Sequence, residues 1–152
     1  MIKIYRKKIV WSEKETQLFS DKIERRRQNN LLRTENKKVW VRSFTTGRLL
    51  HHALCHYLEL EEQETPAFQI GYGENGKPFL LDYKEVHYNL SHSGDWILCA
   101  VSDQPVGIDI QQKSSMRRGL CDRVFSEEEK KLWQGKETDA IFFPIWCVKE
   151  GY

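Results

Sequence analysis

The chain has 152 residues, enough to bury a hydrophobic core as one domain or as two small packed halves. Its 39% hydrophobic and 30% charged residues are typical of a globular protein rather than a disordered one, and no apolar run is long enough to cross a membrane. The net charge of +2 conceals +9 over residues 1–58 (14 Lys and Arg against 5 Asp and Glu) and −7 over the remainder, so the first part should attract anions.

The N-terminal segment predicts a strand and then a helix. Residues 2–11 read as a strand, and the N-terminus lacks the apolar core of a secretory signal, so we expect a cytoplasmic protein. Ser12 and Glu15 have the spacing of a capping box and predict a helix that runs to about residues 24–27. This helix ends in Arg25-Arg26-Arg27, which is either a solvated helix end or a phosphate-binding cluster.

A long amphipathic helix is predicted over residues 37–60. Its apolar side chains recur at roughly helical spacing and predict a core stripe: Trp40, Phe44, Leu50, Leu54 and Leu58. His52 and His56 lie one turn apart, beside His51 and Cys55, which makes a zinc site geometrically possible. No second ligand cluster of suitable spacing occurs elsewhere in the sequence, so solvent-facing histidines are the preferred interpretation.

The next elements are predicted to be extended. Residues 66–72 read as a strand, and residues 73–78 read as a turn that carries Lys77 near its tip. Between residues 87 and 111 the pattern predicts three short strands joined by two tight turns, over residues 91–94 and 102–105.

In the last of these predicted strands, residues 106–111, polar and apolar side chains alternate. Asp109 and Gln111 should share one face, while Ile108 and Ile110 take the other. If the isoleucines are in the core, an acid, an amide and the nearby Ser-His turn are left available to a ligand.

The C-terminal part predicts two helices after a polar linker over residues 112–119. Ser126 and Glu129 form a second capping box, and Thr138-Asp139 can cap a last helix that Pro144 should kink or delay. The cysteines are scattered without a Cys-x-x-Cys pair, which favours small core residues over disulfides or zinc ligands. They are Cys55, Cys99, Cys121 and Cys147.

Five short motifs occur in series over residues 76–150. They are Gly76-Lys77-Pro78, Asn89-Leu90-Ser91-His92-Ser93, Gly107-Ile108-Asp109-Ile110, Phe125-Ser126-x-x-Glu129 and Trp146-x-x-Lys149-Glu150. In this order and at these spacings they resemble the Sfp-type 4′-phosphopantetheinyl transferases. The first 60 residues resemble the family more loosely, through the arginine-rich segment, Val41-Arg42-Ser43 and Gly47.

The resemblance implies an α+β fold of two similar halves, each with helix packed on antiparallel sheet, related by a pseudo-twofold axis with the active site between them. We expect an N-terminal half over residues 1–104 and the start of a C-terminal half over residues 105–152. In the family the closing helix continues and further strands follow, whereas this sequence stops at Gly151-Tyr152. We therefore expect a truncated second half, with Glu150 on a terminal turn.

The family transfers the 4′-phosphopantetheine group of coenzyme A to a serine of an acyl or peptidyl carrier protein. By resemblance, Asp109 and Glu150 would hold Mg²⁺, and Gln111 stands where many members carry Glu. Mg²⁺ typically uses one or two carboxylates together with substrate phosphates, so this donor set is chemically sufficient. The neutral Gln111 predicts weaker Mg²⁺ affinity.

The resemblance also implies the groups that bind coenzyme A. Lys77, Ser91 and His92 would contact its phosphates, and Arg42 and Arg25 would meet the 3′-phosphate. Cations and hydrogen-bond donors of this kind neutralise and align a transferring phosphoryl group. The catalytic set would be His92, Glu150 and Lys149, with Lys149 or a metal-linked group taking the proton of the attacking serine.

Three functions are compared. The first is a working transferase, completed by another chain or by self-association, whose acidic carrier partner would suit the basic half. The second is a vestigial protein that binds coenzyme A without turnover. The third, nucleic-acid binding by the basic half, lacks a recognition helix or stacking-aromatic motif, so we expect no nucleic-acid partner and no membrane partner.

Overall fold

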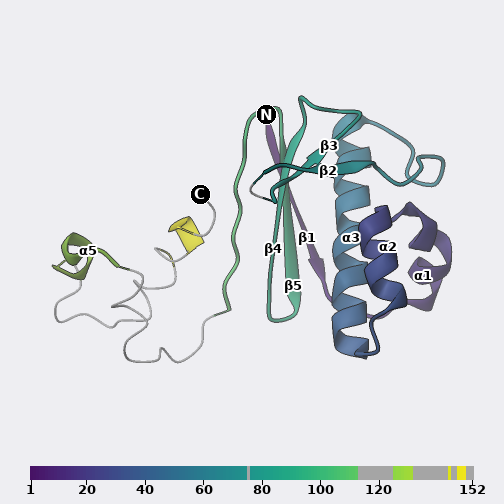
Figure 1. Cartoon of the computed structure of the whole chain (residues 1–152), viewed down its shortest axis with the longest axis horizontal. Helices are drawn as coiled ribbons and strands as arrows, with labels where there is room; N and C mark the ends of the chain where they lie inside the picture. The colour runs from purple at the N-terminus through teal and green to yellow at the C-terminus, as the bar shows by residue number, and fades with distance from the viewer. Residues whose placement is uncertain (75, 113–124, 132–143, 145–146, 150–152) are drawn as a thin grey trace.

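The computed structural model describes residues 1–74, 76–112, 125–131, 144 and 147–149. A long helix packs on one face of a three-stranded antiparallel sheet, and two shorter helices lie on the far side of that helix (Figure 1). The elements are β1 Ile2–Lys8, α1 Glu13–Phe19, η1 Ser20–Lys22, α2 Arg25–Leu32, α3 Lys37–Leu58, β2 Ile70–Tyr72, β3 Pro78–Leu80, β4 His87–Ser93, β5 Trp96–Ser102 and α5 Glu127–Lys131. Within these residues no helix combines the length and hydropathy that a bilayer crossing requires.

The main sheet places the N-terminal strand beside the second strand of the hairpin, in the order β1-β5-β4. The register across the three strands is set by pairs such as those of Cys99 in β5, which lies opposite Tyr5 of β1 on one side and Leu90 of β4 on the other. β2 and β3 form a separate two-stranded sheet, and β3 begins at Pro78, where the sequence predicts only a turn. In the described sheet β4 is therefore an edge strand.

The core lies between α3 and β5. Three side chains of the predicted α3 stripe are buried, and β5 supplies the apolar face opposite them. These side chains expose at most 4% of their surface: Phe44, Leu50, Leu54, Ile97, Cys99 and Val101. Trp40 and Leu58, at the ends of the stripe, are half-buried. Full burial of one such aliphatic side chain contributes about 1.5–3 kcal/mol, so the contact between α3 and β5 is a principal source of stability.

The first helix is shorter than predicted, because the chain leaves it to bury Ile23. The predicted cap is confirmed, since Ser12 Oγ accepts a hydrogen bond from the Glu15 amide at 3.2 Å. α1 ends at Phe19, and after one 3₁₀ turn Ile23 takes extended backbone angles (φ −84°, ψ 140°) and is 1% exposed. A single helix running to residues 24–27 is therefore wrong. The three arginines begin a second helix, α2, instead.

Close packing of α2 on α3 depends on Gly47. A Cβ at this position would lie 2.6 Å from Ile23 Cγ2 and 2.8 Å from Arg27 Cδ, well inside van der Waals contact. The absence of a side chain at Gly47 is what allows Ile23 to be buried and Arg27 to pass over α3.

The β4–β5 turn comes later than predicted, and this moves Ser91 and His92 into a strand. The strands pair as far as Ser93, opposite Trp96, and Gly94 with a φ of 55° begins the turn. The predicted strand over residues 106–111 is also wrong. The segment runs extended alongside β4, on the side of the sheet away from α3, and it makes no backbone ladder with the described strands (Figure 1).

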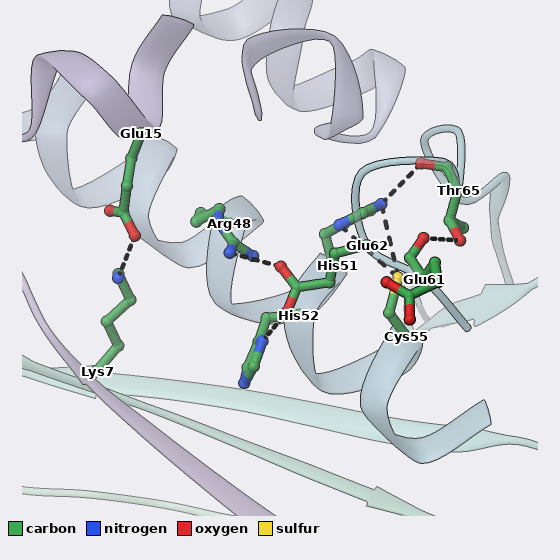
Figure 2. A network of polar contacts seen from close by, with 9 residues as sticks. All are labelled: Lys7, Glu15, Arg48, His51, His52, Cys55, Glu61, Glu62 and Thr65. Carbon is green, nitrogen blue, oxygen red and sulfur yellow. Dashed lines mark hydrogen bonds and ion pairs between the residues drawn. The ribbon is translucent and has the colours of Figure 1, made fainter. Parts of the chain in front are cut away.

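His51 and His52 of α3 have different polar partners (Figure 2), while the rings of His52 and His56 stack at a centroid distance of 6.2 Å. His51 is buried, with Nε2 3.2 Å from the Thr65 carbonyl oxygen, so the expectation that it faces solvent is wrong. His52 pairs with Glu62, which also accepts from Arg48 Nη2 at 2.6 Å. Among the described residues there is no group of three or more potential metal-ligating side chains, on this helix or elsewhere. Cys55 and Cys99 are buried free thiols, as predicted, and Cys121 lies outside the described residues.

Candidate functional site

Ser91 and Asp109, which come from two separate motifs of the sequence, are joined directly. Ser91 Oγ donates a hydrogen bond to Asp109 Oδ1 at 2.6 Å and accepts one from the Ile110 amide at 3.1 Å. The other carboxylate oxygen, Oδ2, is buried and has no hydrogen-bond partner among the described residues. Because a serine has a single O–H to donate, Ser91 cannot also donate to a phosphate while it holds Asp109.

This contact belongs to a ladder of side-chain hydrogen bonds along β4. The amides of Ile108, Ile110 and Gln112 donate to side-chain oxygens of Asn89, Ser91 and Ser93, at 3.2, 3.1 and 2.9 Å. Both series advance by two residues in the same direction, so the segment that carries Asp109 runs parallel to β4. Side-chain oxygens thus replace the backbone acceptors that a neighbouring strand would provide.

His92 follows Ser91 but faces the other side of β4, toward α3. Its Cα partner across the sheet is the buried Ile97, although the imidazole itself is exposed. Partial burial lowers the pKa of His92, and the Arg42 and Arg27 guanidinium groups lower it further. These cations therefore lie near the imidazole, which makes this face of β4 electropositive. Asp109 and the cations near His92 thus lie on opposite faces of β4.

Arg27 is the arginine of α2 that the structure brings toward His92, whereas the resemblance implied Arg25. Arg27 Nε contacts both carboxylate oxygens of Glu24 at 3.0 and 3.1 Å, and Nη1 donates to Ser43 Oγ at 3.4 Å. Glu24 is buried, and burial raises its pKa in spite of the Arg27 charge. The run of three arginines in the sequence indicates a cationic site, but it does not show which of the three faces His92.

Arg25 lines a different feature, a cavity of about 450 Å³ between α2 and the β2–β3 sheet. Arg26 lies at this cavity with its guanidinium carbon 4.4 Å from the centre of the Tyr72 ring. Phe68 and Ile70 supply apolar walls. The cavity thus combines cations with aromatic and aliphatic surface.

Lys77 and Gln111 are not brought into contact with Asp109 or His92. Lys77 is exposed in the β2–β3 connection, where its carbonyl oxygen accepts from the Gly73 amide at 3.0 Å. Gln111 is exposed too, and its Nε2 donates to the Gln112 carbonyl oxygen at 3.2 Å.

The two C-terminal motifs are joined by an ion pair. The predicted capping box is confirmed in both directions: the Ser126 amide donates to Glu129 Oε2 at 2.8 Å, and the Glu129 amide donates to Ser126 Oγ at 3.3 Å. Lys149 Nζ donates to the same Glu129 oxygen at 2.7 Å. Phe125, 5.5 Å from Lys149 Nζ at its ring centre, completes this contact.

Cys147 connects the C-terminal motif to Asp109. Burial raises the pKa of its thiol, and the neighbouring Asp109 carboxylate raises it further. Glu150, the second acid of the expected metal site, lies outside the described residues. The described donors fit a cation in one respect: the buried Asp109 Oδ2 is an acceptor without a partner, and an unpaired buried oxygen is costly unless something binds it.

Comparison with known proteins identifies the family. The model of the 4′-phosphopantetheinyl transferase superfamily matches residues 105–152. The 4′-phosphopantetheinyl transferase gsp of Aneurinibacillus migulanus is 32% identical over 137 residues, covering 88% of this chain and 56% of that protein. Psf-1 of Bacillus pumilus is 38% identical over 109 residues (68% and 47%), and Sfp of Bacillus subtilis (strain 168) is 27% identical over 144 residues (93% and 63%). The chain thus spans less than two thirds of each relative, and it belongs to the 4′-phosphopantetheinyl transferase superfamily.

Proposed function

We propose that the chain takes part in Mg²⁺-dependent transfer of the 4′-phosphopantetheine group of coenzyme A to a serine of an acyl or peptidyl carrier protein. The observation that carries the proposal is the pair Ser91-His92 on edge strand β4. One side chain holds the Asp109 carboxylate, and the other lies near the Arg42 and Arg27 cations. A carboxylate for a metal ion and a cationic surface for phosphates thus lie on the two faces of one strand. The names of the relatives agree with this chemistry.

The cationic face of β4 would bind the phosphates of coenzyme A. His92 in its neutral form can donate one hydrogen bond, and Arg42 and Arg27 add charge that strengthens contacts to anions. Arg25 and Arg26, at the cavity beside Tyr72, would take the nucleotide end, with the ring surface of Tyr72 and Phe68 for the base. Lys77, as the resemblance implies, would contact a phosphate of coenzyme A.

Asp109, Glu150 and Gln111 would hold Mg²⁺. When bound, this ion neutralises phosphate charge and helps to align the reacting groups. Asp109 offers its unpaired Oδ2 for this purpose. Glu150 follows Cys147 by three positions in the sequence, and Cys147 lies beside Asp109.

The proton of the attacking carrier serine would pass to Lys149 or to a metal-linked group. Lys149 Nζ lies 2.7 Å from Glu129 Oε2, and because an ammonium group has no lone pair, Lys149 would have to be the neutral amine to accept that proton. Glu129 therefore becomes a residue that sets the position of Lys149.

The second candidate is coenzyme A binding without turnover. It requires only the cations near His92 and the cavity lined by Arg25 and Arg26. Several further expectations stay predictions: a division of the chain at residue 104, a pseudo-twofold pair of halves, completion by self-association, a cytoplasmic location, and the absence of nucleic-acid and membrane partners.

The acidic carrier would approach the basic N-terminal part.

Intact-mass measurement on an apo carrier protein, incubated with coenzyme A, Mg²⁺ and the chain, tests the first candidate. We expect a gain of one phosphopantetheine group, which Asp109→Asn abolishes. Coenzyme A binding seen by calorimetry, with no mass gain under saturating conditions, would select the second candidate. Absence of both would refute the proposed function.

A further inference from the structure

Ser91 differs from the other members of the side-chain ladder, because it alone contacts a carboxylate. Asn89 and Ser93 each accept one backbone amide, from Ile108 and Gln112. Ser91 accepts the Ile110 amide and in addition donates to Asp109 Oδ1. The Ile110 amide therefore holds the Ser91 hydroxyl oxygen in place, and the hydroxyl hydrogen points at the Asp109 carboxylate.

We propose that Ser91 is a positioning residue, which orients Asp109 so that Oδ2 is presented to a divalent cation. The inference deepens the proposed function and rests on its assignment of Asp109 as a metal ligand. It also revises the role expected for Ser91, which the resemblance had placed among the groups that contact coenzyme A.

The geometry gives the physical reason. A free aspartate side chain samples several rotamers, and a cation must then bear the cost of ordering it. The 2.6 Å bond from Ser91 occupies Oδ1 and leaves Oδ2 as the acceptor still to be satisfied. Carboxylate ligands of metals are commonly held by such outer hydrogen bonds, and loss of one typically costs 10- to 100-fold in metal affinity.

Ser93 provides a matched control. It lies on the same strand and face as Ser91, and its Oγ accepts from the Gln112 amide at 2.9 Å, but within the described residues it makes no hydrogen bond to Asp109 or to another acid. Ser93→Ala and Ser91→Ala each remove one rung of the ladder. Only Ser91→Ala also releases the carboxylate, so the difference between them isolates the orienting contact.

The experiment measures binding of Mn²⁺ to the full chain by electron paramagnetic resonance of the free ion, without any turnover. We expect Ser91→Ala to weaken Mn²⁺ binding about 10-fold or more. Ser91→Thr, which keeps the hydroxyl and suits a strand, should restore most of the affinity, and Ser93→Ala should bind like the parent. Amide hydrogen exchange gives a second readout, because Ser91→Ala should expose the Ile110 amide and Ser93→Ala the Gln112 amide.

Three outcomes would overturn the proposal, and they can be told apart. If Asp109→Asn loses Mn²⁺ binding while Ser91→Ala keeps the parental affinity, the positioning role is wrong and the metal assignment stands. Equal losses in Ser91→Ala and Ser93→Ala would mean that the ladder only fastens the segment. Unchanged Mn²⁺ binding by Asp109→Asn, or none by the parent, would remove the metal assignment itself and Ser91's role with it.

Discussion

His92 of β4 and Arg42 of α3 are electrostatic neighbours. After partial burial of the imidazole, the Arg42 guanidinium is the largest contributor to the lowered pKa of His92, and Arg27 adds to it. An edge strand and two helices therefore assemble one cationic surface from residues that are up to 65 positions apart in the sequence.

We predict that Arg42→Gln raises the pKa of His92, because it removes a cation that opposes protonation. The pKa can be followed by NMR titration of the imidazole C–H signals. Arg33→Gln, an exposed substitution just after α2, should leave it unchanged. Inorganic phosphate added to the parent should also raise the pKa of His92, since a bound anion favours the imidazolium. An unmoved titration in both experiments would contradict an anion site at this face.

We predict that Gly47→Ala destabilises the protein in spite of the better helix propensity of alanine. Propensity alone would stabilise α3 by about 1 kcal/mol. The new Cβ would come within 2.6 Å of Ile23 Cγ2 and 2.8 Å of Arg27 Cδ, and overpacking of this kind costs about 1–3 kcal/mol. We expect a net loss of up to about 2 kcal/mol in urea unfolding.

Gly73→Ala is the control for this substitution, because the nearest atom to its Cβ would be 3.7 Å away. It should change the free energy of unfolding by less than about 0.5 kcal/mol. A stabilised Gly47→Ala protein would show that α2 can move away from α3 without cost.

We predict that stability falls as the pH drops below 6.5, in part through His51. Burial lowers the pKa of His51 from its ordinary value of 6.5, and the Arg48 charge lowers it further, although the Thr65 carbonyl opposes the shift. The unfolded chain therefore takes up this proton at higher pH than the folded chain does. The contribution is fully present above the unfolded pKa and is lost as the pH falls from about 6.5 toward the folded value.

His51→Gln should make the free energy of unfolding less dependent on pH between about 6.5 and 5, because glutamine can still donate to Thr65 but does not titrate. His56→Gln, at an exposed position, is the matched comparison. An identical pH slope in the parent and in His51→Gln would show that His51 does not carry this dependence.

We predict that Gln111→Glu strengthens divalent-cation binding roughly fivefold, since one added charge near a solvated ion is worth about 1 kcal/mol. In the structure the Gln111 amide donates to the Gln112 carbonyl oxygen, a bond that a carboxylate cannot make, so the new side chain would also be released. Competition of Mg²⁺ against bound Mn²⁺ measures the change. Gln112→Glu controls for net charge, and equal half-saturation in Gln111→Glu and the parent would exclude Gln111 from the site.

The amino-acid sequence by itself determined the elements whose periodicity is long or whose caps are local. The α3 stripe, the Ser12 cap and the Ser126–Glu129 capping box are specified by neighbours within a few turns, so they could be predicted. The order and spacing of the motifs likewise indicate Asp109 and the family.

Only the tertiary structure decided which side chains meet. Ile23 leaves the helix because its burial beneath Gly47 outweighs local helix propensity. The break between α1 and α2 decides where α2 begins, and therefore which of its arginines, Arg27 rather than Arg25, lies near His92. Ser91 is a strand residue because the chain turns only at Gly94. Its hydroxyl contacts Asp109 because the segment that follows β5 runs back along β4. Such contacts depend on the relative placement of distant segments, and no local pattern encodes that placement.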